Sequence, residues 1–79
     1  MTYVYISRSV CRPNEKYVGV TGNLKRRLAE HNAGKSAYTA RYKPWEVETY
    51  IAFSDTEKAI AFEKYLKSGS GRAFCVRHF

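Results

Sequence analysis

Apolar and polar residues alternate along three stretches of the chain, as they do in half-buried β-strands. The stretches span residues 2–7, 16–20 and 45–53. The first two are joined by a short connection that contains the turn signal Pro13-Asn14. Because this connection is too short for a parallel crossover, the pattern predicts an antiparallel hairpin.

Each predicted strand has two faces. In the hairpin, the faces that bear Tyr5 and Tyr17 can coincide, so we expect the two rings to lie near each other. Gly19, in the second strand, lets another group approach the backbone closely. In the third strand, strict alternation places on one face Val47, Thr49, Ile51 and Phe53, and on the other Glu46, Glu48 and Tyr50.

A short basic helix is predicted after the hairpin, capped by Asn23 or Thr21 and ended by Gly34. The spacing of a core-facing stripe, i, i+3, i+4 and i+7, is met by Leu24, Arg27, Leu28 and His31. Two of these four side chains are polar and can be positively charged. An arginine on a stripe that should be apolar is the first indication of a functional site.

A second helix is predicted from the capping box of Ser54 and Glu57 to about Ser68. Its inward stripe consists of Ala59, Phe62, Glu63 and Leu66. A buried acid costs several kcal/mol unless it is paired or binds a metal, so Glu63 needs a partner.

Two segments are less distinct. Residues 37–44 are either a loop or a helical turn, in which basic and aromatic side chains interleave as they do on nucleic-acid-binding surfaces. The tail, residues 70–79, is predicted to form one or two helical turns. We expect Phe74 and Val76 to pack against the domain, and Arg72 and Arg77 to remain outside.

The 79 residues suffice for one small domain, residues 1–79, with a formal charge of +7. Residues 1–43 contain nine Lys and Arg against two Glu, whereas the remainder is balanced at five and five. This asymmetry favours a polyanionic partner over a merely soluble basic surface. The cysteines, Cys11 and Cys75, show no metal-binding spacing, and there is no signal peptide or transmembrane run, so we expect a cytoplasmic protein and no membrane partner.

Two strand tyrosines, an inward arginine, an inward histidine and an inward glutamate together suggest phosphodiester hydrolysis. One carboxylate can hold one magnesium ion when water and phosphate supply the other ligands. An arginine can neutralise the charged phosphorus centre, and a tyrosine or histidine can take a proton from water. Each residue also has a structural interpretation. Arg27 and Glu63 could form a buried ion pair, and His31 could be a packed side chain.

These residues resemble the GIY-YIG nuclease domain of homing endonucleases and of the excision-repair incision subunit. The resemblance lies in Tyr3-Val4-Tyr5, Tyr17-Val18-Gly19, residues 23–28 and His31-Asn32, and it extends to about Leu66. The C-terminal segment, residues 63–74, is similar to the small stand-alone bacterial branch. The family's first motif usually has glycine where Tyr3 stands, and Val20 replaces a lysine of the repair subunit.

The resemblance implies an α+β fold, in which a small three-stranded antiparallel sheet is flanked by helices. It implies an endonuclease that uses Mg²⁺, with Mn²⁺ as an alternative, and that acts on DNA with structural or weak sequence selectivity. The implied catalytic residues are Tyr5, Tyr17, Arg27, His31 and Glu63, of which Glu63 holds the metal. One tyrosine acts as or positions the base, and we favour Tyr17. The nucleic-acid-binding residues are predicted to be Lys25, Arg26, Lys35, Tyr38, Thr39, Arg41 and Lys43.

Two rival functions remain at this point. One is a nucleic-acid-binding module of the same fold with weak catalysis. It is motivated by the departure at Val20 and by Tyr38, which stands where members of the family often have a histidine. The other is a structural or protein-interaction domain in which Arg27 and Glu63 are only an ion pair. The chain is expected to be a monomer or a weak dimer.

Overall fold

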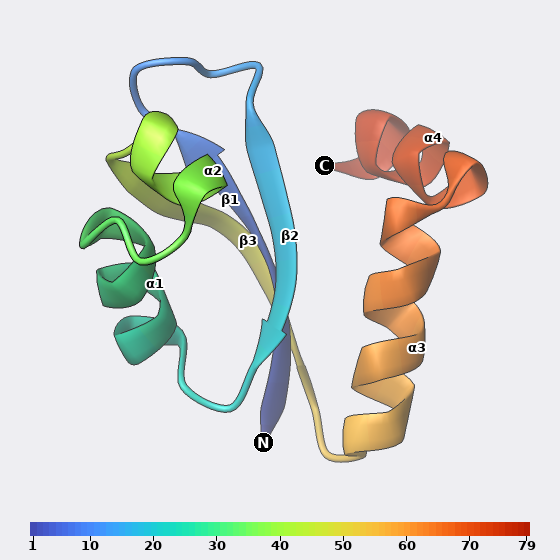
Figure 1. The fold of residues 1–79 in the computed structure, drawn as a ribbon. Helices are drawn as coiled ribbons and strands as arrows, with labels where there is room; N and C mark the ends of the chain where they lie inside the picture. Colours follow the sequence, from blue (N-terminus) through green and yellow to red (C-terminus); the bar gives the residue numbers. More distant parts are fainter.

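The computed structural model describes residues 1–79, and at its centre is a three-stranded antiparallel sheet (Figure 1). The strands are β1 (Thr2–Ser9), β2 (Lys16–Thr21) and β3 (Trp45–Phe53), in the spatial order β2-β1-β3. The hairpin and the third strand are therefore confirmed. The central position of β1 leaves β2 at one edge of the sheet.

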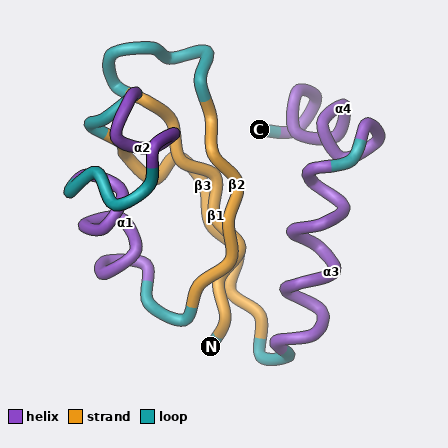
Figure 2. The backbone as a smooth tube through the Cα atoms, in the orientation of Figure 1, coloured by secondary structure: helices purple, strands orange, loops and turns teal.

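Four helices flank the sheet in two groups. On one side lie α1 (Leu24–Asn32) and the short α2 (Ala37–Arg41), and on the other lie α3 (Thr56–Lys67) and α4 (Gly69–His78) (Figure 2). The predicted α+β class, a small sheet flanked by helices, is confirmed. The principal extents of the domain are 29 × 26 × 18 Å.

The strand register sorts the side chains between the two helical layers. Tyr5 lies opposite Gly19 and Ser7 opposite Tyr17, so both tyrosines are on one face, with ring centroids 6.2 Å apart. Val4 lies opposite Val20, on the reverse face. The expected proximity of the two tyrosines is thus confirmed.

A register shift between Ile6 and Ser7 interrupts the pairing of β1 with β3. Ile6 lies opposite Thr49, but the next residue, Ser7, lies opposite Val47. Residues that face each other across a ladder share a face of the sheet, so the extra residue moves Val47 to the face of Tyr5. The strict alternation predicted for the third strand is therefore wrong at Val47, and Tyr50 likewise shares the face of Tyr5.

The hydrophobic core lies between the sheet and α3. Its fully buried members are Val4, Ala59 and Leu66, and packed against them are Val18, Val20, Phe53, Phe62, Phe74 and Cys75. The apolar stripe of the second predicted helix is confirmed as its core-facing side. The opposite face of the sheet is left for polar and aromatic groups.

Two details of the helices refine or differ from the sequence expectations. Asn23 caps α1, accepting a hydrogen bond from the Arg26 amide at 3.0 Å. The cap of α3 is Asp55 and not Ser54, because the Asp55 carboxylate accepts hydrogen bonds from the amides of Glu57 and Lys58. The longer reach of the neighbouring carboxylate makes it the better acceptor for the first turn.

The C-terminal segment forms a full helix, α4, which lies across the C-terminal end of α3 (Figure 1). Phe74 packs against the core as expected, but Val76 is 88% exposed, so its predicted packing is wrong. Gly71 is buried where the two helices meet: a Cβ at this position would lie 1.7 Å from the Tyr65 carbonyl oxygen. Close approach of the backbone therefore requires glycine here.

Candidate active site

Tyr5 occupies the centre of the candidate site. It is only 2% exposed, and its ring lies directly over Gly19 of the neighbouring strand. A Cβ added to Gly19 would lie 2.4 Å from the Tyr5 hydroxyl oxygen and 2.6 Å from the ring carbon that bears it. The glycine of the second motif therefore makes room for the tyrosine of the first.

His31 meets Tyr5 from the last turn of α1. The Tyr5 hydroxyl and His31 Nε2 are 2.9 Å apart, and His31 is 3% exposed. Burial raises the pKa of Tyr5, and burial together with the nearby charge of Arg27 lowers the pKa of His31. At neutral pH the pair is therefore a neutral phenol beside a neutral imidazole, joined by one hydrogen bond.

Tyr17 is the accessible member of the tyrosine pair. Its ring packs edge-on against His31, with centroids 4.7 Å apart, and the side chain is half-buried. Tyr17 also lines a cavity of about 630 Å³ between β2 and helices α3 and α4, whereas Tyr5 does not. Of the two motif tyrosines, Tyr17 is therefore the one that a water molecule or a substrate can reach.

Arg27 lies beside both tyrosines. Its pKa is raised, first by hydrogen-bonding interaction with Tyr5, then by Glu30, and to a lesser extent by Tyr17. The guanidinium donates to Glu30 Oε1 at 3.1 Å and stays 39% exposed. Arg27 is thus permanently charged, positioned by its neighbours and open to an incoming anion.

Glu30 was missed by the sequence analysis. It is the i+3 neighbour of Arg27 on α1, and it also lies 3.9 Å from Arg26 Nε. Arg27 in turn holds the pKa of Glu30 below its usual range. The i+3 and i+4 spacing to two arginines was the available signal.

Glu63 lies on α3, across the sheet from α1 (Figure 1). Its side chain is 14% exposed, and its Oε2 is paired with Lys67 Nζ at 2.5 Å. Lys67 Nζ in turn lies 5.8 Å from the centre of the Tyr17 ring. Glu63 therefore connects to the tyrosines through Lys67, a residue that the sequence analysis did not select.

The alternative interpretation, a buried ion pair between Arg27 and Glu63, is excluded because each residue is paired within its own helix. The cavity beside the hairpin is lined by Tyr17 and Lys67, but by neither Arg27 nor Glu63. The two charged residues do not share one pocket. What they have in common is Tyr17, which interacts with Arg27 and lies under the lysine bound to Glu63.

Glu63 is the predicted metal ligand, and no three His, Cys, Asp or Glu residues are grouped as in a multi-ligand centre. Its environment nevertheless fits a cation, because the carboxylate is largely enclosed and already holds the ammonium of Lys67. A single carboxylate of this kind suits Mg²⁺, which keeps several water or phosphate ligands.

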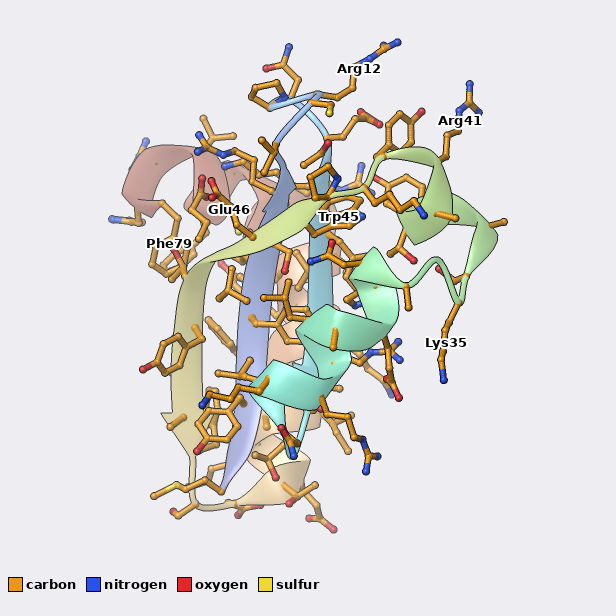
Figure 3. All side chains as sticks on the ribbon, turned by 90° about the vertical axis from the view of Figure 1, so that its left-hand side faces the viewer. Arg12, Lys35, Arg41, Trp45, Glu46 and Phe79 are labelled. Atoms are coloured by element: carbon orange, nitrogen blue, oxygen red, sulfur yellow. The ribbon has the colours of Figure 1, made fainter.

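The predicted nucleic-acid-binding residues fall into two groups. The basic side chains are exposed, and Lys35 and Arg41 extend outward around α2 in Figure 3. Tyr38 is 41% exposed, and its ring lies 5.8 Å from Trp45. Thr39 is fully buried and bonded to Ser36, so its predicted contact with nucleic acid is wrong. The other exposed basic residues are Lys25, Arg26 and Lys43.

Trp45 and Asn32, which the sequence analysis did not select, fasten the helical layer to the sheet. The indole Nε1 donates to the Thr39 carbonyl at 2.8 Å. The Asn32 side chain accepts from the Trp45 amide at 2.5 Å and donates to its carbonyl at 3.2 Å. These bonds fix the end of α1, and with it His31, against β3.

Comparison with known proteins agrees with this geometry. The description "GIY-YIG catalytic domain" belongs to a family model that matches residues 1–74. A UPF0213 protein of Cupriavidus pinatubonensis is 35% identical over 79 residues, covering 95% of this chain and 86% of the relative. A UPF0213 protein of Streptococcus pyogenes serotype M5 is 38% identical over 72 residues, covering 90% and 76%.

The fold and the tyrosine-centred site define a catalytic domain of the nuclease type. The chain belongs to the GIY-YIG family, and its relatives are small UPF0213 proteins. The resemblance drawn from the motifs is confirmed. None of the helices has the length and apolar character needed to span a membrane.

Proposed function

We propose that this protein is a divalent-metal-dependent endonuclease that hydrolyses phosphodiester bonds in DNA, with Mg²⁺ as the ion and Mn²⁺ as a substitute. The observation that supports this most is the grouping of Tyr5, Tyr17 and His31, with Arg27 one helical turn before His31 on α1. A fixed, half-exposed guanidinium beside a reachable phenol is what binding and attack at a phosphodiester require. A cytoplasmic location and a role in DNA repair belong to the same proposal.

Arg27 binds the phosphate. Its guanidinium can donate two parallel hydrogen bonds to phosphate oxygens and stabilise the charge that develops on them in the transition state. Without substrate, the guanidinium donates a hydrogen bond to Glu30. The phosphate of the substrate then replaces Glu30 as the partner of Arg27.

Tyr17 is the proposed base for the attacking water. It lines the cavity, whereas the Tyr5 hydroxyl is buried and engaged with His31. Tyr5 and His31 then act as a positioning pair, since the His31 ring packs against Tyr17 at 4.7 Å. A rigid neighbour of this kind fixes the direction in which the phenol points.

Glu63 would hold the metal ion. When bound there, the ion supplies Lewis-acid stabilisation of the phosphate oxygens. Contacts along the rest of the DNA backbone are assigned to exposed basic residues and to Tyr38, with Thr39 left out because it is buried. Phosphate contacts of this kind give affinity without reading a long sequence, so we propose structural or weak sequence selectivity. The basic residues are Lys25, Arg26, Lys35, Arg41 and Lys43.

The test is nicking of supercoiled plasmid and of labelled single strands, flaps and duplexes, in Mg²⁺ or Mn²⁺, with and without EDTA. We expect metal-dependent cleavage that Arg27→Gln and Glu63→Gln each reduce by about 100-fold or more. Arg77→Gln is the control, because Arg77 is an exposed arginine with the same charge and is assigned no contact with DNA. Absence of cleavage by the wild type on every substrate would contradict the proposal.

A nucleic-acid-binding module with weak catalysis is the second candidate. It is favoured by the ion pair between Glu63 and Lys67 and by the single candidate metal ligand. In that case, binding measured by fluorescence anisotropy falls with rising salt, survives Glu63→Ala, and is accompanied by no metal-stimulated cleavage.

A further inference from the structure

Lys67 pairs with Glu63, the proposed metal ligand, and its ammonium also lies over the ring of Tyr17, the proposed base. We propose that Lys67 is a built-in competitor for the metal ion: its ammonium neutralises Glu63 until a divalent cation displaces it. This inference rests on the proposed role of Glu63 and adds a regulatory residue to that site.

Glu63 and Lys67 form an ion pair in the last turn of α3. Lys67 is the last residue of α3, one helical turn beyond Glu63, which is the spacing of an i,i+4 ion pair. The Glu63 side chain is 14% exposed and that of Lys67 is 50% exposed. The carboxylate is therefore largely enclosed by the protein, whereas the ammonium that pairs with it is half-exposed.

Glu63 has no counter-ion other than Lys67. An enclosed carboxylate is costly without a positive partner. Lys67 is the one basic residue within ion-pair distance of Glu63. Arg27 is paired with Glu30 on another helix. A divalent cation that binds Glu63 must therefore compete with Lys67 and with no other residue.

A cavity next to Lys67 can accept the ammonium once it leaves Glu63. Lys67 and Tyr17 both line the 630 Å³ cavity, together with Arg72. The released side chain has open volume next to Tyr17. Exchange of the counter-ion at Glu63 would thus free a positive charge for the phosphate at the same moment that the metal arrives.

The experiment measures metal binding directly, by electron paramagnetic resonance of free Mn²⁺ titrated with protein and no DNA. We expect Lys67→Met to bind Mn²⁺ about fivefold more tightly than Lys64→Met, the value of a favourable exposed ion pair. Lys64→Met is the matched control, because it removes the same charge from an exposed neighbour on the same helix. Lys67→Arg keeps the charge and should stay near the wild-type affinity.

The result that would overturn the inference is equal Mn²⁺ affinity of Lys67→Met and Lys64→Met. Glu63→Gln separates this outcome from failure of the proposed function. If Glu63→Gln binds Mn²⁺ like the wild type, Glu63 is not the metal ligand and the function proposal loses its metal site. If Glu63→Gln loses binding while Lys67→Met matches its control, only the role of Lys67 is wrong.

A second readout follows the lysine itself. In a protein labelled with ¹⁵N-lysine, the Nζ signal of Lys67, assigned by its loss in Lys67→Arg, should move when Mg²⁺ is added, and the signal of Lys64 should not. Glu63→Gln should abolish the change. An Mg²⁺-insensitive Lys67 signal in a wild type shown to bind Mn²⁺ would equally overturn the inference.

Discussion

The Tyr5 hydroxyl and His31 Nε2 lie 2.9 Å apart in a buried hydrogen bond that joins the central strand to α1, 26 residues later in the chain. Because β1 is central, this bond ties the helix that bears Arg27 to the middle strand of the sheet. The bond therefore has two consequences, one for stability and one for the protonation of His31.

Tyr5→Phe should destabilise the domain by about 1–3 kcal/mol, because the substitution leaves a buried imidazole nitrogen without a partner. Urea denaturation followed by circular dichroism measures the change. Tyr50→Phe is the control, since Tyr50 is 58% exposed and the substitution removes the same hydroxyl from the surface. Equal stabilities for the two variants would contradict the importance of the buried bond.

Stability should fall as pH drops below about 6.5, the ordinary pKa of histidine. Burial lowers the pKa of His31 in the folded protein, so the unfolded chain binds more protons in this range and stability rises with pH. The contribution is complete above 6.5 and is lost as pH falls toward the folded pKa. Urea midpoints between pH 5 and 7.5 should show this slope.

The slope should remain in His78→Gln, which removes the exposed C-terminal histidine, and flatten in His31→Gln. An NMR titration of the imidazole protons gives the pKa of His31 directly. A value at or above 6.5 would be inconsistent with the desolvated environment described here.

Gly19→Ala should cost about 1–3 kcal/mol, the usual penalty of an overpacked site, because its Cβ would overlap the Tyr5 hydroxyl. Gly22→Ala is the matched control, since a Cβ there meets no atom within 4 Å. Thermal melts and the near-ultraviolet tyrosine signal distinguish the two variants. If both melt alike, Tyr5 does not lie over Gly19 as described.

Gly71→Ala should separate α4 from α3, because the new Cβ would overlap the Tyr65 carbonyl and the Leu66 backbone. We expect a loss of about 3 kcal/mol, at the upper end of overpacking effects. Gly69→Ala places its Cβ in open space and should be neutral or stabilising by up to about 1 kcal/mol. Chemical denaturation of both variants checks the difference, and a stable Gly71→Ala would refute the close contact.

Glu30→Gln should strengthen binding of a labelled single-stranded oligonucleotide, because it releases Arg27 from its partner on α1. Glu57→Gln changes the net charge equally from a position without an ion-pair partner and is the control. Fluorescence anisotropy should show Glu30→Gln binding at least about twofold more tightly than Glu57→Gln. Identical affinities would mean that Glu30 does not compete with the phosphate.

Local patterns predicted the three strands and the two main helices, and the resemblance to the GIY-YIG domain implied the α+β fold and the candidate site residues. Alternation located three strands, and helical spacing directed His31 and Glu63 inward. The position of Gly19 within a strand also predicted that another group would approach its backbone closely, and that group is the Tyr5 ring. These features depend on residues close in sequence, which is why the sequence alone sufficed.

Features that depend on long-range contacts could not be predicted. The bulge between β1 and β3 moved Val47 to the other face, because strict alternation assumes that no strand has an extra residue. Thr39 was assigned to a surface, but it is buried next to Trp45. The role of Lys67 depends on how α3 lies beside the edge strand, and no spacing on α3 reveals the position of Tyr17.

The longest extent of the domain, 29 Å, is shorter than the roughly 34 Å of one turn of B-DNA. With a single Tyr17 and Arg27 site in a body of this size, one docking event under the proposed function reaches the backbone of one strand. Severing both strands then takes two separate encounters. A supercoiled plasmid should therefore accumulate as an open circle before any linear product forms.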